Sequence, residues 1–307
     1  MATSEILADT DRDVEQAVLM ALRYFSIFRY PLTSDEIQKY ASALCSLHSI
    51  NETLEELVLT NKVFLYLGYY SIREDIRSQV ESREIANKLA AIKIKSAIRT
   101  GKFIYNFPFV RFVGISGSLS KGVADENSDF DFFVITAKNR LWVCRTILHL
   151  FKKLTFITGD QYKYCMNYFV DGSQVNIEER NIFTAVELIT LYPVAGEAAF
   201  EDLKKANSWV FDFLPNIDFQ SFSKDLKEKR PVLKEMLEFA LGLLSADRLN
   251  SKLMALTDKR WRKKWFKKGY PTVDYDLAFK TTLHVSKNHP ANYQKKILKC
   301  LADFKES

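Results

Sequence analysis

Residues 113–135 read Val113-Gly-Ile-Ser-Gly-Ser-Leu-Ser-Lys-Gly-Val-Ala-Asp-Glu-Asn-Ser-Asp-Phe-Asp-Phe-Phe-Val-Ile135, and this is the most informative segment of the chain. An apolar strand leads into a Gly117-Ser118 turn, a short polar helix and a second apolar strand that carries Asp129 and Asp131. Because side chains alternate between the faces of a strand, these carboxylates point the same way, with roughly 7 Å between their Cα atoms. Two acids on a buried strand are costly unless a cation neutralises them. The pattern therefore predicts a Mg²⁺ or Mn²⁺ site.

The turn between the two strands predicts an anion site beside the metal. Backbone N–H groups that follow Gly117-Ser118 at a helix N-terminus favour an anion such as a polyphosphate. The alternative is a surface turn before an edge strand with solvated acids. Phe130, Phe132 and Phe133 favour a central strand instead, because an aromatic-rich apolar run of this kind is typical of a buried strand.

This arrangement resembles the nucleotidyltransferases of the DNA polymerase β superfamily. The mark of that family is an apolar residue before Gly-Ser or Gly-Gly, a Gly a few residues on, and Asp-x-Asp opening the next strand. The matching residues here are Gly117, Ser118, Gly122, Asp129 and Asp131. Most of the chain also resembles, more loosely, bacterial proteins predicted to be nucleotidyltransferases, in which a winged-helix segment precedes the catalytic core. The resemblance implies transfer of a nucleoside monophosphate from a nucleoside triphosphate, such as ATP, to an acceptor hydroxyl or phosphate, with release of pyrophosphate.

The resemblance also implies a role for each residue of the motif. Asp129 and Asp131 would hold the metal and act as catalytic residues, and two metal ions about 3.5–4 Å apart would activate the attacking hydroxyl and stabilise the leaving oxygen. The residues expected to bind the nucleotide are Gly117, Ser118, Ser120 and Lys121. The acceptor remains open: a small molecule, a protein side chain and an RNA end are all compatible with the motif.

The third carboxylate of the family is not evident in this chain. It comes from a later strand and orients the acceptor hydroxyl or removes its proton. The corresponding stretch, Tyr164-Cys-Met-Asn-Tyr-Phe-Val170, carries Asn167 at its centre, and an amide can ligate a metal but cannot accept a proton. Glu178 or Glu179 could replace it from the following strand. The second hypothesis is therefore a catalytically degenerate, nucleotide-binding regulatory or interaction protein.

Composition places the chain in an ordinary globular class. Its 307 residues carry a formal net charge of +6, and no apolar run approaches the ~20 residues needed to cross a bilayer. The polar N-terminus does not read as a signal peptide, so a cytoplasmic location and no membrane contact are expected. The four cysteines are far apart in sequence and predict isolated thiols, without a disulfide or zinc framework.

Residues 1–72 read as a winged-helix domain. An amphipathic helix over 11–28 precedes two capping boxes, at 33–36 and 49–52, and each box predicts the start of a further helix. Residues 62–72 predict two short strands around Gly68. The third helix carries Glu52, Glu55 and Glu56, which DNA phosphates would repel. A role of this helix in packing or protein contact is therefore favoured over sequence-specific DNA binding.

The rest of the chain is expected to form three further regions. A connecting helix lies in 73–106 and is expected to end at Gly101. The nucleotidyltransferase core spans 107–182, with a helix over 140–158 and a hairpin of 162–170 and 174–179 joined at Asp171-Gly172. Residues 183–307 predict a helical C-terminal domain. The fold class is thus α+β, with a central mixed sheet flanked by helices.

A basic stretch stands out in the C-terminal region. Seven of the eleven residues in 259–269 are Lys or Arg and none is acidic. One interpretation is a helix whose Trp261 and Trp265, four residues apart, face the core while the cations face water. The other is an anion-binding surface for nucleic acid or a triphosphate tail. The two interpretations are compatible.

Overall fold

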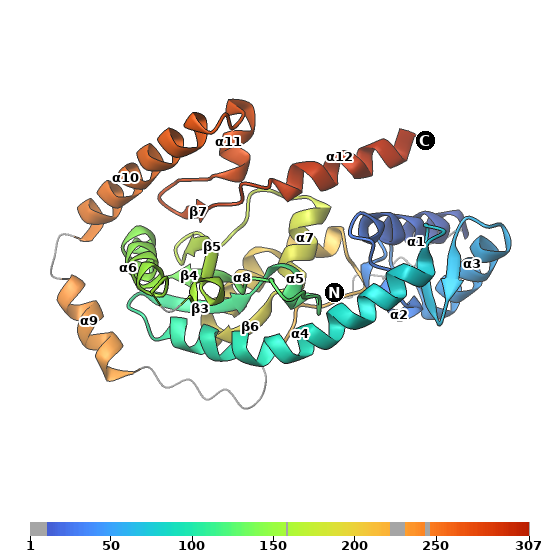
Figure 1. Cartoon of the computed structure of the whole chain (residues 1–307), viewed down its shortest axis with the longest axis horizontal. Helices are drawn as coiled ribbons and strands as arrows, with labels where there is room; N and C mark the ends of the chain where they lie inside the picture. Colours follow the sequence, from blue (N-terminus) through green and yellow to red (C-terminus); the bar gives the residue numbers. More distant parts are fainter. Residues whose placement is uncertain (1–10, 158, 222–230, 243–245, 307) are drawn as a thin grey trace, which may run out of the picture.

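A computed structural model describes residues 11–157, 159–221, 231–242 and 246–306. In these residues, helices surround a five-stranded mixed sheet, and a separate two-stranded sheet lies near the N-terminus (Figure 1). The α+β class expected from the sequence is therefore confirmed. In the described part of the chain, no helix is both long and apolar enough to cross a membrane.

Residues 11–71 form a compact unit that we call the N-terminal module. Its elements are α1 (Asp11–Ser26), α2 (Ser34–Tyr40), α3 (Leu47–Leu59), β1 (Phe64–Tyr66) and β2 (Tyr69–Ser71). The predicted capping box at α2 is confirmed, because Thr33 Oγ1 accepts from the Glu36 N–H and Glu36 Oε2 accepts from the Thr33 N–H. The second predicted box is wrong: α3 begins earlier, with the Ser46 side chain as its cap.

The connecting helix, α4 (Ile76–Tyr105), runs from the N-terminal module along the sheet (Figure 1). The predicted stop at Gly101 is wrong, because the helix continues for another turn. A Cβ at Gly101 would lie 3.0 Å from Val194 Cγ1 on the neighbouring strand, so the glycine serves close packing and not termination.

The five-stranded sheet has the order β6-β3-β4-β5-β7. Strand β3 is antiparallel to β4 and β6, β4 is parallel to β5, and β5 is antiparallel to β7. The strands are β3 (Val110–Ile115), β4 (Asp131–Thr136), β5 (Cys165–Asp171), β6 (Tyr192–Ala195) and β7 (Val285–Lys287). Strands β6 and β7 correct the expectation that residues 183–307 are helical.

The expected hairpin at Asp171-Gly172 is also wrong. Strand β5 ends there, but residues 174–179 form no strand. The partner of β5 on that side is β7, which comes from far along the chain. Asp171 instead closes a local turn, in which its Oδ1 accepts from the N–H and the Oγ of Ser173.

Helices cover both faces of the sheet. Phe112, Phe133 and Val170 face one layer, which contains α7 (Ile182–Ile189) and α8 (Glu197–Ala206). Val113, Phe132 and Val134 face the opposite layer, which contains α4 and α6 (Leu141–Leu154). The alternation along each strand explains why β3 and β4 read as continuous apolar runs, since both faces are buried.

The C-terminal segment wraps around the sheet and returns to the N-terminal module. Its helices are α9 (Val232–Gly242), α10 (Ala246–Lys267), α11 (Thr272–Ala278) and α12 (Tyr293–Glu306). Trp261 and Trp265 of α10 pack against Phe279, as predicted. Ile297 and Leu301 of α12 join the core that contains α1 and α7, so the first and last helices of the described chain pack together (Figure 1).

Two short 3₁₀ turns, Gln161–Lys163 and Ser208–Asp212, complete the described elements. The four cysteines all lie in the described ranges and are free thiols. This confirms the expectation of isolated thiols.

Candidate functional site

The candidate site is built around Asp131, the first residue of β4. Its Oδ1 accepts a hydrogen bond from Asn167 Nδ2 on β5, at 2.7 Å. The amide of Asn167 is in turn oriented by Cys165, whose Sγ donates to Asn167 Oδ1 at 3.3 Å. The pairing of β4 with β5 passes from Met166 to Tyr168, so Asn167 is an extra residue at a bulge. Such bulges re-aim a side chain, and here the bulge turns Asn167 toward Asp131.

Gly117 brings the preceding turn against the same carboxylate. Its φ is +70°, and a Cβ at this position would lie 2.8 Å from Asp131 Oδ2. The Ser116 N–H also donates to the backbone carbonyl of Asp131, at 2.9 Å. Both the backbone conformation and the space beside Asp131 therefore require glycine at position 117. The predicted strand carries only one of the two acids, because Asp129 precedes β4.

Lys121 links the turn to α7. Its Nζ donates to the carbonyl of Gly117 at 3.0 Å and to Glu187 Oε1 at 2.8 Å. Glu187 was not singled out from the sequence, although a signal was present: it is the single acid in the otherwise apolar helix 182–189. Ser120 does not line the cavity that this group faces, and its Oγ donates to the same Gly117 carbonyl at 2.9 Å.

The electrostatics of the site favour a bound cation. Burial, together with the charges of Asp129 and Glu187, raises the pKa of Asp131 to about 6, against the opposing effect of the charge of Lys152. A carboxylate whose ionised form is disfavoured by burial and by neighbouring acids is stabilised when a cation binds. The environment of Asp131 therefore favours a role as a metal ligand.

A cavity of about 570 Å³ opens onto this cluster. The sheet and its turns contribute Ser116, Gly117, Ser118, Lys121, Asp131 and Asn167 to its lining. Helix α7 contributes Glu187, and the remaining walls come from α1 and α2 and from residues 287–294. Cavities of this volume enclose small molecules and cofactors. The cavity therefore joins the motif to the N-terminal module and to the C-terminal segment.

The structure brings together most, but not all, of the residues that the sequence indicated. Gly117, Ser118, Lys121, Asp131 and Asn167 line one cavity. Three others lie outside its lining: Asp129, Ser120 and Glu178. Asp129 is exposed just before β4. Glu178 points to solvent, with 61% of its side chain exposed, and pairs with Lys280 at 2.6 Å. Glu179, the other alternative for a third acid, does line the cavity.

The residues around Asp131 fit a metal ion that arrives with its phosphates. In the described ranges, no group of three or more His, Cys, Asp or Glu side chains is placed to hold a metal ion by itself. Asp131 supplies one carboxylate beside the Gly117 turn. A second carboxylate, that of Asp129, lies two residues earlier, exposed and outside the cavity lining, and the Asn167 amide orients Asp131 through its nitrogen. Mg²⁺ typically takes one or two carboxylates and completes its shell with substrate phosphates and waters. The donor set thus matches Mg²⁺ bound together with a polyphosphate.

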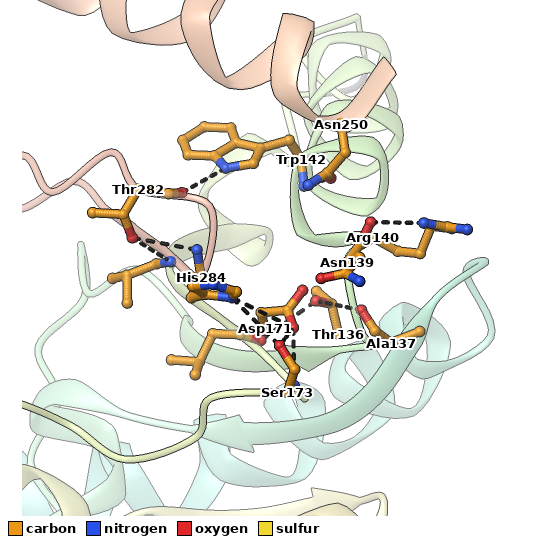
Figure 2. Close-up of polar contacts among 12 residues, drawn as sticks. Thr136, Ala137, Asn139, Arg140, Trp142, Asp171, Ser173, Asn250, Thr282 and His284 are labelled. Carbon is orange, nitrogen blue, oxygen red and sulfur yellow. Dashed lines mark hydrogen bonds and ion pairs between the residues drawn. The ribbon is translucent and has the colours of Figure 1, made fainter. Parts of the chain in front are cut away.

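A second polar cluster lies at the opposite end of the same strands. Figure 2 shows Asp171 at the end of β5, near Thr136 at the end of β4, with Ser173 and His284 beside it. This is not a hydrolase triad, because Ser173 Oγ and Asp171 Oδ1 both face the same ring nitrogen of His284, at 3.4 and 3.8 Å. In a triad, the imidazole bridges the two groups through different nitrogens. The cluster therefore closes the turn after β5.

Figure 2 also shows how the C-terminal segment is attached to the core. Asn250 of α10 accepts from the Trp142 N–H at 2.8 Å, at the start of α6, whose own N-cap residue makes no side-chain cap. Trp142 Nε1 donates to the Thr282 carbonyl at 2.8 Å. A helix end that lacks a local cap is thus capped by a distant segment, which fixes the course of the chain toward β7.

Comparisons with protein-family models, with curated proteins and with solved structures found no match to this chain.

Proposed function

We propose that this protein is a metal-dependent nucleotidyltransferase. The observation that carries the proposal is the contact between the Gly117 turn and Asp131: a left-handed glycine places its backbone against a half-buried carboxylate, and both line one cavity with Ser118 and Lys121. Phosphate chemistry requires a carboxylate that can hold a cation and donors that can contact phosphate oxygens. Here Asp131 supplies the carboxylate, and the Ser118 hydroxyl and the Lys121 ammonium group supply the donors.

In the proposed reaction, an acceptor oxygen attacks the α-phosphorus of a nucleoside triphosphate. The bond from the α-phosphorus to the bridging oxygen breaks, and pyrophosphate leaves. Asp131, supported by Asp129, would hold Mg²⁺, which supplies charge neutralisation at the phosphates when bound. Asn167 keeps the Asp131 carboxylate in one orientation. Lys121 and Ser118 would contact the β- and γ-phosphates, with the Gly117 backbone between them.

Two lining carboxylates are candidates for receiving the acceptor proton. Glu187 pairs with Lys121, and Glu179 pairs with Lys280 at 3.2 Å. Glu187 lines the same cavity as Asp131, and Lys121 joins it to Gly117, whose turn contacts Asp131. We assign the role of base to Glu187 within this proposal, in place of Glu178, which points to solvent.

We also propose a fold type for the N-terminal module and for the core. Three helices followed by a short antiparallel hairpin, with Leu32 bridging to Tyr70, support a winged-helix interpretation of the N-terminal module. A strand, a glycine turn and a second strand opened by Asp131 support a polymerase β-like core. These interpretations rest on the order and pairing of the elements.

The experiment is a pyrophosphate-release assay with the full chain, Mg²⁺ and each of the four nucleoside triphosphates, over a panel of hydroxyl- and phosphate-bearing acceptors. We expect release with at least one pair of substrates and a loss of about 100-fold or more in Asp131→Asn. Equal release by wild type and variant would contradict the proposal.

One observation favours a second candidate, a catalytically degenerate nucleotide-binding protein. The side chain that faces Asp131 from the neighbouring strand is the amide of Asn167, which cannot accept a proton. This candidate predicts Mg²⁺-dependent nucleotide binding, lost in Asp131→Asn, without pyrophosphate release from any acceptor in the panel.

A further inference from the structure

Three buried polar atoms in the cavity have no hydrogen-bond partner among the described residues. They are the Tyr24 hydroxyl, Asn288 Oδ1 and His289 Nε2, and all three residues line the cavity that contains Asp131. Buried polar groups in folded proteins are nearly always hydrogen-bonded. Three unpaired groups from two distant segments, gathered in one cavity, indicate that a ligand supplies the missing partners.

The segment that carries Asn288 and His289 is held next to Asn167. Strand β7 pairs with β5, and just beyond it the Asn288 N–H donates to the backbone carbonyl of Asn167, at 3.0 Å. Asn167 is the residue that orients Asp131. The His289 N–H donates to the Ala278 carbonyl at 2.9 Å, which fixes the backbone of this segment. A ligand that contacts Asp131 and fills the cavity would therefore also meet the segment that carries Asn288 and His289.

The protonation states of these groups indicate which hydrogen-bonding groups a ligand must offer. Burial, together with the charge of Glu187, raises the pKa of Tyr24 well above its usual range, so the hydroxyl keeps its proton and donates. Burial and the charge of Lys287 lower the pKa of His289 to about 4, so its ring is neutral at pH 7. Asn288 Oδ1 accepts. The ligand edge that fits is uncharged and carries both donors and acceptors.

Aromatic rings surround these polar groups. Tyr24 packs edge-on against Phe25, with ring centroids 5.2 Å apart, and His289 packs edge-on against Tyr168 at 6.1 Å. The other rings in the lining come from the N-terminal module, the sheet, α7 and α12: Phe28, Tyr30, Tyr40, Phe133, Phe183 and Tyr293. Flat heteroaromatic molecules are held in this way, by stacking on rings and by hydrogen bonds along their edges.

We propose that this part of the cavity binds the base of the nucleoside triphosphate, with Tyr24, Asn288 and His289 contacting the edge of the base. The inference rests on the proposed function and deepens it. It also assigns a role to the N-terminal module, because α1 and α2 form one wall of the base pocket. The residues that select the nucleotide thus come from outside the strand–turn–strand core.

The experiment uses matched variants of the full chain. Tyr24→Phe removes only the unpaired hydroxyl. Its control is Tyr275→Phe, because the Tyr275 hydroxyl is also buried and unpaired but lies outside the cavity lining. His289→Phe keeps a flat ring and removes both nitrogens. Its control is His149→Phe, because His149 Nε2 is also buried and unpaired but lies outside the cavity lining. Calorimetry with Mg²⁺ measures binding of the four nucleoside triphosphates and of inorganic triphosphate.

We expect Tyr24→Phe and His289→Phe to weaken binding of the preferred nucleoside triphosphate about fivefold to tenfold and to reduce the preference among the four bases. Binding of inorganic triphosphate should be unchanged, and both control variants should bind every probe as wild type does.

Two other results would overturn the inference while leaving the proposed function standing: nucleotide affinity that is unchanged in Tyr24→Phe and His289→Phe, or an equal loss for inorganic triphosphate. If neither nucleotides nor inorganic triphosphate bind the wild-type protein with Mg²⁺, the proposed function fails and this inference fails with it.

Discussion

Asn167 and Asp131 are joined across two parallel strands by a hydrogen bond of 2.7 Å, in which the amide nitrogen donates to the carboxylate. The bulge in β5 is what turns Asn167 toward its partner, since a regular strand would pair every residue of β5 with β4. An amide at this place stabilises one orientation of Asp131 without adding a second charge. A carboxylate there would repel Asp131.

Asn167→Asp tests this relationship. Two carboxylates at hydrogen-bond distance cannot both ionise at low cost, so we expect the variant to be destabilised by about 1–3 kcal/mol at pH 7.5 in the absence of metal. Mg²⁺ should restore part of the loss, since a cation between the acids removes their repulsion. Thermal unfolding with and without Mg²⁺ measures both effects. Asn61→Asp, on the surface, is the control, and a variant as stable as wild type without metal would contradict the account.

Gly117→Ala separates backbone strain from the clash with Asp131. Gly117 and Gly122 have nearly the same φ, +70° and +74°, but only a Cβ at Gly117 meets another atom, Asp131 Oδ2 at 2.8 Å. Alanine in the left-handed region costs about 1–2 kcal/mol at either position. We expect Gly117→Ala to lose more stability than Gly122→Ala and also to lose Mg²⁺-dependent nucleotide binding. Equal effects of the two substitutions in urea denaturation and in binding would exclude the close contact.

Asp131→Asn is expected to stabilise the protein at neutral pH while abolishing function. The pKa of Asp131 in the folded protein is about 6, above its usual 3.8, so the folded state holds the proton more tightly than the unfolded state. The contribution of this group to folding is therefore fully present below about pH 4 and is lost as the pH rises through 6. Relative to wild type, the variant should gain about 2 kcal/mol between pH 4 and pH 7.5. Urea denaturation at these pH values checks this, and a constant difference would refute it.

Arg83 anchors the N-terminal module to α4. Its guanidinium donates to both carboxylate oxygens of Glu36, at 2.7 and 2.8 Å, and lies over the rings of Tyr30 and Tyr69. Removing one partner of a buried ion pair leaves the other charge uncompensated, so Arg83→Met should cost about 3–5 kcal/mol.

The control for Arg83 lies on the same helix. Arg77 pairs with Glu81 at 3.2 Å, but both side chains are exposed, and Arg77→Met should change the free energy of unfolding by less than about 1 kcal/mol. Urea denaturation of both variants measures the difference. A similarly small loss in Arg83→Met would show that the module is held by its apolar contacts alone.

Local signals in the sequence predicted the elements that are stabilised locally. Three such elements are present: the Thr33–Glu36 capping box, the 62–72 hairpin and the apolar strands around the Gly117 turn. Their hydrogen bonds and burial patterns depend on residues that are close in sequence. The hairpin at Asp171 failed because β5 pairs with β7, a strand of three residues with no local signal. The predicted helix stop at Gly101 was wrong because Val194, the side chain against which Gly101 packs, is distant in sequence.

The residues of the candidate site also fall into two groups, those that are close in sequence and those that meet only in the fold. Asp131, Gly117 and Lys121 lie in one stretch and were predicted together. Tyr24 and His289 reach the cavity only because α12 packs beside α1 and because β7 joins the sheet. Side chains that meet through long-range packing leave no pattern in one sequence, and a lone histidine or tyrosine gives no spacing to recognise.

The role of Asp131 can be measured by calorimetric titration of the four nucleoside triphosphates, with Mg²⁺ and with EDTA, into wild type, Asp131→Asn and the surface control Glu126→Gln. We expect Mg²⁺-dependent binding of at least one nucleotide to wild type and to Glu126→Gln, and none to Asp131→Asn. Binding that survives in Asp131→Asn, or that is unchanged by EDTA, would contradict the assignment of Asp131 as the centre of a metal-dependent nucleotide site.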